Sequence, residues 1–248
     1  MNQYDGLISV DPLKLYFGEP YVVNKYITIY QPTIGDIIEY GEREYFSMIN
    51  TITAIPSDMK SQLWDMQLDW NKITDFQLFT MMSKTLSQTQ TSIVLGDIDF
   101  QRMKLVENPQ NGEPILKDPI TGVVIDELAY KIISAYLCKL HNITKKIEKA
   151  GNKYTKQVLI DEDRQKREYA AKQPYKSFLL PIISAIKARQ GYTRDYVKAM
   201  GLCELMTELN RLQIIVNTDA LIGGAYSGMM DTSKVKKSQF NWLRDIDE

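Results

Sequence analysis

The sequence contains few of the side chains from which catalytic and metal centres are built. Its 248 residues include one histidine, His141, and two cysteines, Cys138 and Cys203, which lie far apart in the chain. A structural zinc site needs four such ligands, and a nucleophile relay needs a base beside the nucleophile. Cys138 and His141 share one predicted helix but make an incomplete zinc site. We therefore expect no catalytic residue, metal or cofactor, and predict that Cys138 packs in the core beside a helix-end histidine, which would favour the negative end of the helix dipole when protonated.

The sequence also lacks the usual features of secreted and membrane proteins. Two cysteines cannot form a disulfide framework, which favours reduced thiols in a cytosolic protein. The N-terminal residues MNQYDGLISVDP lack the basic and apolar regions of a signal peptide. No run of eighteen apolar residues is present, so no membrane-spanning helix is expected. These features predict a cytoplasmic protein with no membrane partner.

The charges are balanced, which limits the kinds of partner that the whole chain attracts. Thirty basic residues stand against thirty-one acidic residues, and the formal net charge is -1. Such a chain has no overall field that attracts nucleic acid or an anionic membrane, so a diffuse nucleic-acid binder is disfavoured. A composition of 44% hydrophobic and 25% charged residues is typical of a globular protein with a sizeable core.

Helix caps and apolar periodicity predict an α+β protein that is predominantly α-helical. Thr33 is a predicted N-cap, and the carboxylate of Asp36 is placed to reach back to the start of that helix. Further helices are predicted at residues 42–54, after Ser57 and Asp58, from Thr74, and from Asp126 to near Asn142. Alternating patterns predict one or two small antiparallel β-sheets in the first half, from residues 13–17 with 27–30 and from residues 92–106, 115–116 and 123–125.

Composition divides the chain into three predicted parts. Residues 1–142 form a mixed helical and β region, residues 143–175 a basic charged helix or linker, and residues 176–248 a helical region; one continuous domain is the alternative. In the last part, helices are expected from Phe178, from Thr193 and over residues 202–215. The glycines of Gly223-Gly224-Ala225-Tyr226-Ser227-Gly228 are not followed by the lysine and serine of a phosphate-binding loop.

The basic part of the chain has two interpretations. From Lys139 to Lys176, eleven Lys or Arg residues stand against five Asp or Glu residues. A solvated helix with internal pairs such as Glu162 with Lys166 and Asp163 with Arg167 explains this pattern. A docking surface for an acidic partner or nucleic acid, built on Lys145, Lys146 and Lys149, is the alternative. Because the first 75 residues carry eleven acidic and five basic residues, the acidic partner is hypothesised to be another copy.

Apolar surfaces are the expected functional feature. The eleven methionines are explained mostly by core packing, but thioethers also suit an adaptable groove for a partner's amphipathic helix. For each aromatic or aliphatic candidate, core packing is the competing explanation. The predicted apolar contributors come from the front and rear helices: Tyr45, Phe46, Trp64, Leu209, Leu212 and Ile215.

The segment ITIYQPTIGDIIEYGE, from Ile27 to Glu42, begins a pattern that continues as a helical body and closes with GAYSGMMDTSKVKKSQFNWLRDI. This pattern resembles the tail assembly chaperones encoded by tailed phages and prophages of Gram-positive bacteria. The resemblance rests on a short strand leading into a helix start with Pro32, Thr33, Gly35 and Asp36, and it spans much of the chain. The chain is longer than many members of that group.

The resemblance implies a non-enzymatic protein of the host cytoplasm that self-associates. It would bind the long helices of the tape-measure protein while tail-tube subunits polymerise around them. Two alternatives remain open: a structural virion subunit of the baseplate, hub or connector, and a nucleic-acid-binding protein that uses the basic segment. Purified particles should lack a chaperone but contain a structural subunit at fixed copy number.

Overall fold

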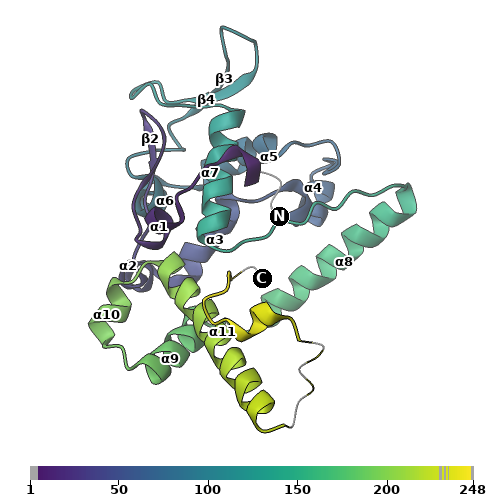
Figure 1. The fold of residues 1–248 in the computed structure, drawn as a ribbon. Helices are drawn as coiled ribbons and strands as arrows, with labels where there is room; N and C mark the ends of the chain where they lie inside the picture. Colours follow the sequence, from purple (N-terminus) through teal and green to yellow (C-terminus); the bar gives the residue numbers. More distant parts are fainter. Residues whose placement is uncertain (1–4, 229–230, 232, 234, 247–248) are drawn as a thin grey trace.

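The computed structural model describes residues 5–228, 231, 233 and 235–246, and Met229 and Met230 of the closing motif lie outside them. The described residues confirm a predominantly helical α+β fold with two small antiparallel sheets in the first half (Figure 1). No helix among them is long and apolar enough to cross a membrane. The strands are β1 (Tyr21–Asn24), β2 (Ile27–Ile29), β3 (Lys104–Glu107), β4 (Pro114–Lys117) and β5 (Val124–Ile125). The α-helices are α1 (Pro12–Tyr16), α2 (Ile34–Tyr40), α3 (Glu42–Ile52), α4 (Lys60–Asp65), α5 (Asp75–Met82), α6 (Gln88–Leu95), α7 (Glu127–Leu140), α8 (Lys153–Lys172), α9 (Leu179–Gln190), α10 (Arg194–Ala199) and α11 (Leu202–Tyr226).

The turn from β2 into α2 follows the predicted capping chemistry. The backbone N–H of Asp36 donates to Thr33 Oγ1 at 3.1 Å, and the N–H of Thr33 donates to the Asp36 carboxylate at 2.8 Å. These two bonds satisfy donors that the first helical turn leaves free. Thr33 also forms an isolated antiparallel β-bridge with Gly201, and the N–H of Ile34 donates to the carbonyl of Met200. These contacts join the start of α2 to the C-terminal helices.

The predicted strand at residues 13–17 is wrong. Asp11 caps a short helix there by accepting a hydrogen bond from Leu13 N–H at 2.9 Å, and Pro12 occupies the first helical turn, where its fixed φ is favourable. The first sheet is instead a hairpin of β1 and β2, in which Tyr21 pairs with Ile29. The strand predicted at residues 27–30 is present.

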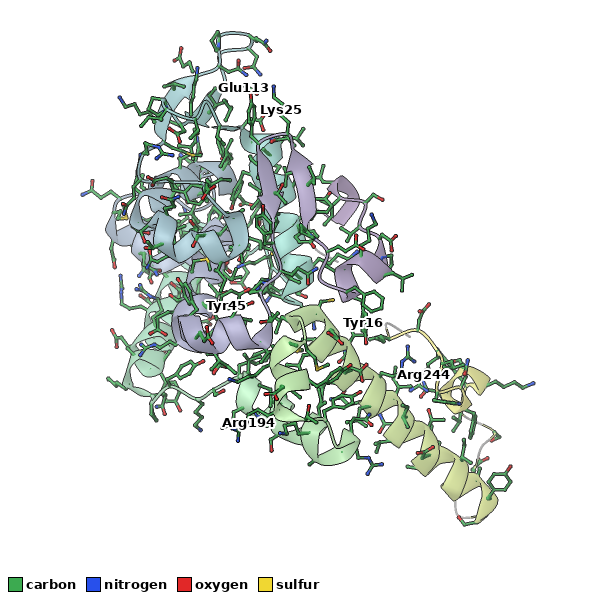
Figure 2. All side chains as sticks on the ribbon, turned by 90° about the vertical axis from the view of Figure 1, so that its left-hand side faces the viewer. Tyr16, Lys25, Tyr45, Glu113, Arg194 and Arg244 are labelled. Atoms are coloured by element: carbon green, nitrogen blue, oxygen red, sulfur yellow. The ribbon has the colours of Figure 1, made fainter. Side chains whose placement is uncertain are left out.

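The second sheet is also shorter than predicted. Ser87 and Gln90 form a capping box that starts α6, so residues 92–95 are helical and their β-favouring side chains pack as part of a helix. The sheet begins at β3 and has the order β3-β4-β5, with Leu105 opposite Leu116. The β3–β4 hairpin projects from one end of the molecule, where Glu113 lies (Figure 2).

The α7 helix starts where the sequence predicts it. The side chain of Asp126 accepts a hydrogen bond from Ala129 N–H at 2.7 Å. Most apolar residues of this helix are buried, but Leu128 is exposed. The helix ends at Leu140, and His141 is its C-cap.

One large hydrophobic cluster joins the first and last parts of the chain. Leu179, Ile186 and Leu205 from the C-terminal helices belong to the same buried cluster as Ile34 and the side chains of α3 and α7. A second, smaller cluster lies around α4 and α8 and consists of Ala54, Leu63, Trp70, Leu78 and Ile160. Gly223 and Gly224 belong to α11, so the glycine-rich segment is helical up to Tyr226.

Candidate protein-interaction surfaces

Tyr45 is a core residue, which corrects its prediction as a partner contact. Its side chain is 0% exposed, and its hydroxyl lies 2.6 Å from Nε2 of His141. The ring also packs edge-on against Phe46, which is partly buried at the margin of the core. The helical spacing identified the buried face of α3 correctly but did not separate its centre from its margin.

His141 is neutral at pH 7, so the stabilisation expected of its protonated form at the helix end is absent at that pH. Its Nδ1 lies 2.7 Å from the carbonyl of Leu137, and the side chain is buried between α3 and α7. Burial lowers the pKa of His141 to about 4, because the cost of removing the imidazolium from water exceeds the stabilisation from its hydrogen bond to the Leu137 carbonyl. Cys138 is buried one turn away, as predicted.

A shallow groove follows the outer face of α3. Its cavity volume is about 590 Å³ beside α4, and neighbouring hollows continue it past Arg43 in both directions. The lining combines the edge of Phe46 with amide, hydroxyl and charged groups. The principal residues of this groove are Arg43, Phe46, Ser47, Asn50, Gln62 and Tyr175.

The basic residues proposed for nucleic-acid binding differ in their accessibility. Lys145 forms an ion pair with Asp58 at 2.8 Å, and its side chain is largely covered. Lys146 is 84% exposed and pairs with Glu148 at 2.9 Å, whereas Lys149 lies on the surface. Thus the structure does not present the three lysines as one open basic patch.

Glu148 fixes the segment between α7 and α8 to the body. Its carboxylate accepts a hydrogen bond from Lys60 at 2.8 Å, and its backbone carbonyl accepts one from Trp70 Nε1 at 3.1 Å. Hydrogen bonds from Lys60 and Lys146 lower the pKa of Glu148 to about 2. Acidic and basic parts of the chain therefore meet within one molecule.

The α8 helix lies against α4 through both apolar and charged contacts. Lys156 pairs with Asp69 at 2.6 Å, and Arg164 pairs with Asp65 at 2.6 Å. Trp64, a predicted contact residue, lies beside this junction, with Lys156 Nζ 5.8 Å from its ring centre. The predicted pairing of Asp163 with Arg167 is replaced by a bond from Ser61 N–H to Asp163 at 2.9 Å.

The three rear residues lie on the later part of α11, residues 209–226, which we call the α11 arm. Leu209, at the start of the arm, packs against the main hydrophobic cluster. Leu209, Leu212 and Ile215 are half-buried, Val216 is 41% exposed and Tyr226 is 90% exposed. Asp219 is the one charged residue from 212 to 226. Figure 2 shows α11 extending away from the body that contains Tyr45. This arrangement offers apolar side chains around much of the helix.

The C-terminal segment packs along one side of the α11 arm. Arg244 is buried there and donates to Thr218 Oγ1 at 3.2 Å and to the carbonyl of Gln239 at 2.9 Å. Arg211 donates to the carbonyls of Trp242 and Arg244, each at 2.8 Å. Figure 2 shows Arg244 beside α11. Polar bonds hold the tail there, while Trp242 remains exposed. No local sequence pattern predicts that Arg244 is buried, because its partner Thr218 lies on another element.

Comparison with protein-family models, with curated proteins and with solved structures found no match. Within the part of the chain that the structure describes, no three His, Cys, Asp or Glu side chains are grouped to hold a metal ion.

Proposed function

We propose that this protein is a tail assembly chaperone of a tailed phage that acts by binding and not by catalysis. Its clients would be the helices of the tape-measure protein, which it would keep soluble while tail-tube subunits polymerise. The observation that carries this proposal is the α11 arm, where large apolar side chains are half-buried or exposed and Asp219 is the one charged residue after Arg211. The resemblance of the Ile27–Glu42 segment supports the choice of client.

A helix that is apolar around most of its circumference is normally buried, because exposed apolar surface costs free energy in water. The arm is about 27 Å long at ~1.5 Å per residue, which matches several turns of a client helix. The tail covers the side that contains Thr218, while Val216 and Tyr226 remain accessible. A client's apolar stripe would cover this remaining surface.

Co-expression with the tape-measure protein tests the proposal. The wild-type chain should increase the soluble fraction of that protein, and the double variant Leu212→Asp/Ile215→Asp should not. The matched control Gln213→Asp/Asn217→Asp adds the same charge to exposed positions of the same helix and should retain the activity. Equal solubilisation by both double variants would contradict a role for the arm.

Purified phage particles distinguish the chaperone from a structural subunit. We expect this chain to be absent from them by mass spectrometry. Its presence at fixed copy number would replace the proposed function with that of a virion component.

A further inference from the structure

The surface beneath α8 is an apolar site that a helix already occupies. Within α8, all of which is described, only Ile160 is buried, and it is 0% exposed. Ile160 enters the cluster of Leu63, Trp70 and Leu78, around which Met59 and Met82 also pack. Residues 165–172, the last two turns of α8, are all exposed. Ile160, with the partly buried Leu159 beside it, therefore supplies the apolar attachment of a 20-residue helix to this cluster.

Polar contacts on both sides of Ile160 align the helix over α4. Lys156, one turn before it, reaches Asp69, and Arg164, one turn after it, reaches Asp65. Between them, Asp163 accepts hydrogen bonds from Ser61 N–H at 2.9 Å and from Ser61 Oγ at 2.6 Å. Arg167 also donates a hydrogen bond to Ser61 Oγ at 3.2 Å. The surface thus contacts the aliphatic side chain of Ile160, cations on both sides of it and one carboxylate.

These contacts hold α8 less firmly than the core holds its neighbours. The Arg164–Asp65 pair is about half exposed, and ion pairs of that kind contribute little and weaken in salt. Regions with few buried apolar contacts open locally without global unfolding. Segments without regular secondary structure precede and follow α8, and they include Gly151 and Pro174. Figure 1 shows α8 running along the outside of the molecule.

We propose that the α4 surface beneath α8 is a docking site for an amphipathic helix of a partner protein, and that α8 is its internal competitor. The partner helix would carry an aliphatic residue with basic residues four positions before and after it, because Asp65 and Asp69 face those positions. Trp70 and the methionines form an adaptable floor for that aliphatic side chain. This site is separate from the α11 arm, so the inference does not depend on the proposed function.

A labelled peptide of residues 152–173 is the probe for this site. In the full-length variant Ile160→Asp, the chain's own α8 should leave the surface, and the peptide should bind at least about tenfold more tightly than to wild type, because internal competition is removed. A peptide carrying Ile160→Asp should not bind. Binding should weaken at high salt and change the fluorescence of Trp64 and Trp70.

Two controls make the outcome decisive. Tyr169→Asp places the same charge on an exposed position of α8 and should leave peptide binding as in wild type. Hydrogen exchange of the wild-type protein should show α8 amides opening before those of α7, and faster at high salt, whether or not Ile160→Asp folds well. Exchange of α8 only with global unfolding, or no peptide binding after α8 is released, would overturn the proposal.

Discussion

Burial of His141 makes folding stability depend on pH in a range where few other side chains titrate. His141 is the only histidine in the chain, and burial lowers its pKa to about 4 from the usual 6.5. Between these values the unfolded chain binds a proton that the folded protein does not. The stability contributed by the neutral imidazole is therefore fully present above pH 6.5 and is lost as pH falls towards 4.

The size of this effect follows from the two pKa values. A separation of this size corresponds to about 3 kcal/mol at ~1.36 kcal/mol per pKa unit. Roughly 2 kcal/mol of that should already be lost between pH 7 and pH 5, because the unfolded imidazole is almost fully protonated at pH 5. Glu148 has a pKa of about 2, so the stability that its ion pairs contribute is lost mainly below pH 5. The effects of His141 and Glu148 therefore fall in different pH ranges.

Urea unfolding at pH 7 and pH 5 measures this loss, and the variant His141→Gln is the control. Glutamine retains an amide that can bond to Tyr45 and the Leu137 carbonyl but does not titrate. The variant should therefore lose about 2 kcal/mol less than wild type over this range. The single imidazole resonance in a proton NMR titration gives the folded pKa directly. A midpoint near 6.5, or equal losses in both proteins, would refute the argument.

Two other substitutions test local contacts. Thr33→Ala removes the capping box of α2 and should lower the free energy of unfolding by about 1 kcal/mol in urea denaturation, whereas Thr33→Ser should retain it. Asp118→Asn removes the charge of a buried carboxylate that accepts hydrogen bonds from Nε and Nη2 of Arg102. Thermal and urea unfolding should show that the free energy of unfolding falls by about 1–3 kcal/mol. Asp97→Asn changes an exposed carboxylate and should be neutral; equal losses would show that the Arg102 contact contributes nothing.

Helix starts were predictable because their chemistry is local. Thr33, Thr74, Asp126 and Thr193 each cap a helix in the structure, and each accepts a backbone hydrogen bond from a residue three positions later. Such bonds depend on a few consecutive residues, so the sequence carries all the information needed. The start of α4 differs, since Asp163 from a distant helix meets the N–H of Ser61. That contact depends on tertiary packing and gives no local pattern.

The functional surfaces were less predictable than the helices because exposure is a tertiary property. Tyr45 and Leu212 occupy similar apolar stripes in the sequence, yet α7 covers the first and much of the α11 arm projects beyond the body. The same limit applies to Ile93 and Val94, whose β-branched side chains fit either period. Arg244 shows the converse case, a charged residue that long-range hydrogen bonds place inside.

The acidic first part of the chain and the basic segment meet within one molecule, whereas the sequence led to the hypothesis of pairing between copies. Asp58, Asp65 and Asp69 pair with lysine or arginine side chains of the same molecule. These pairs cannot simultaneously join two copies, so salt should loosen α8 without changing the size of any assembly. If copies associate through the α11 arm instead, apolar contact should make that association persist at high salt. Sedimentation at low and high salt therefore separates pairing within one chain from pairing between chains, and dissociation at high salt would favour exchange of the basic segment between copies.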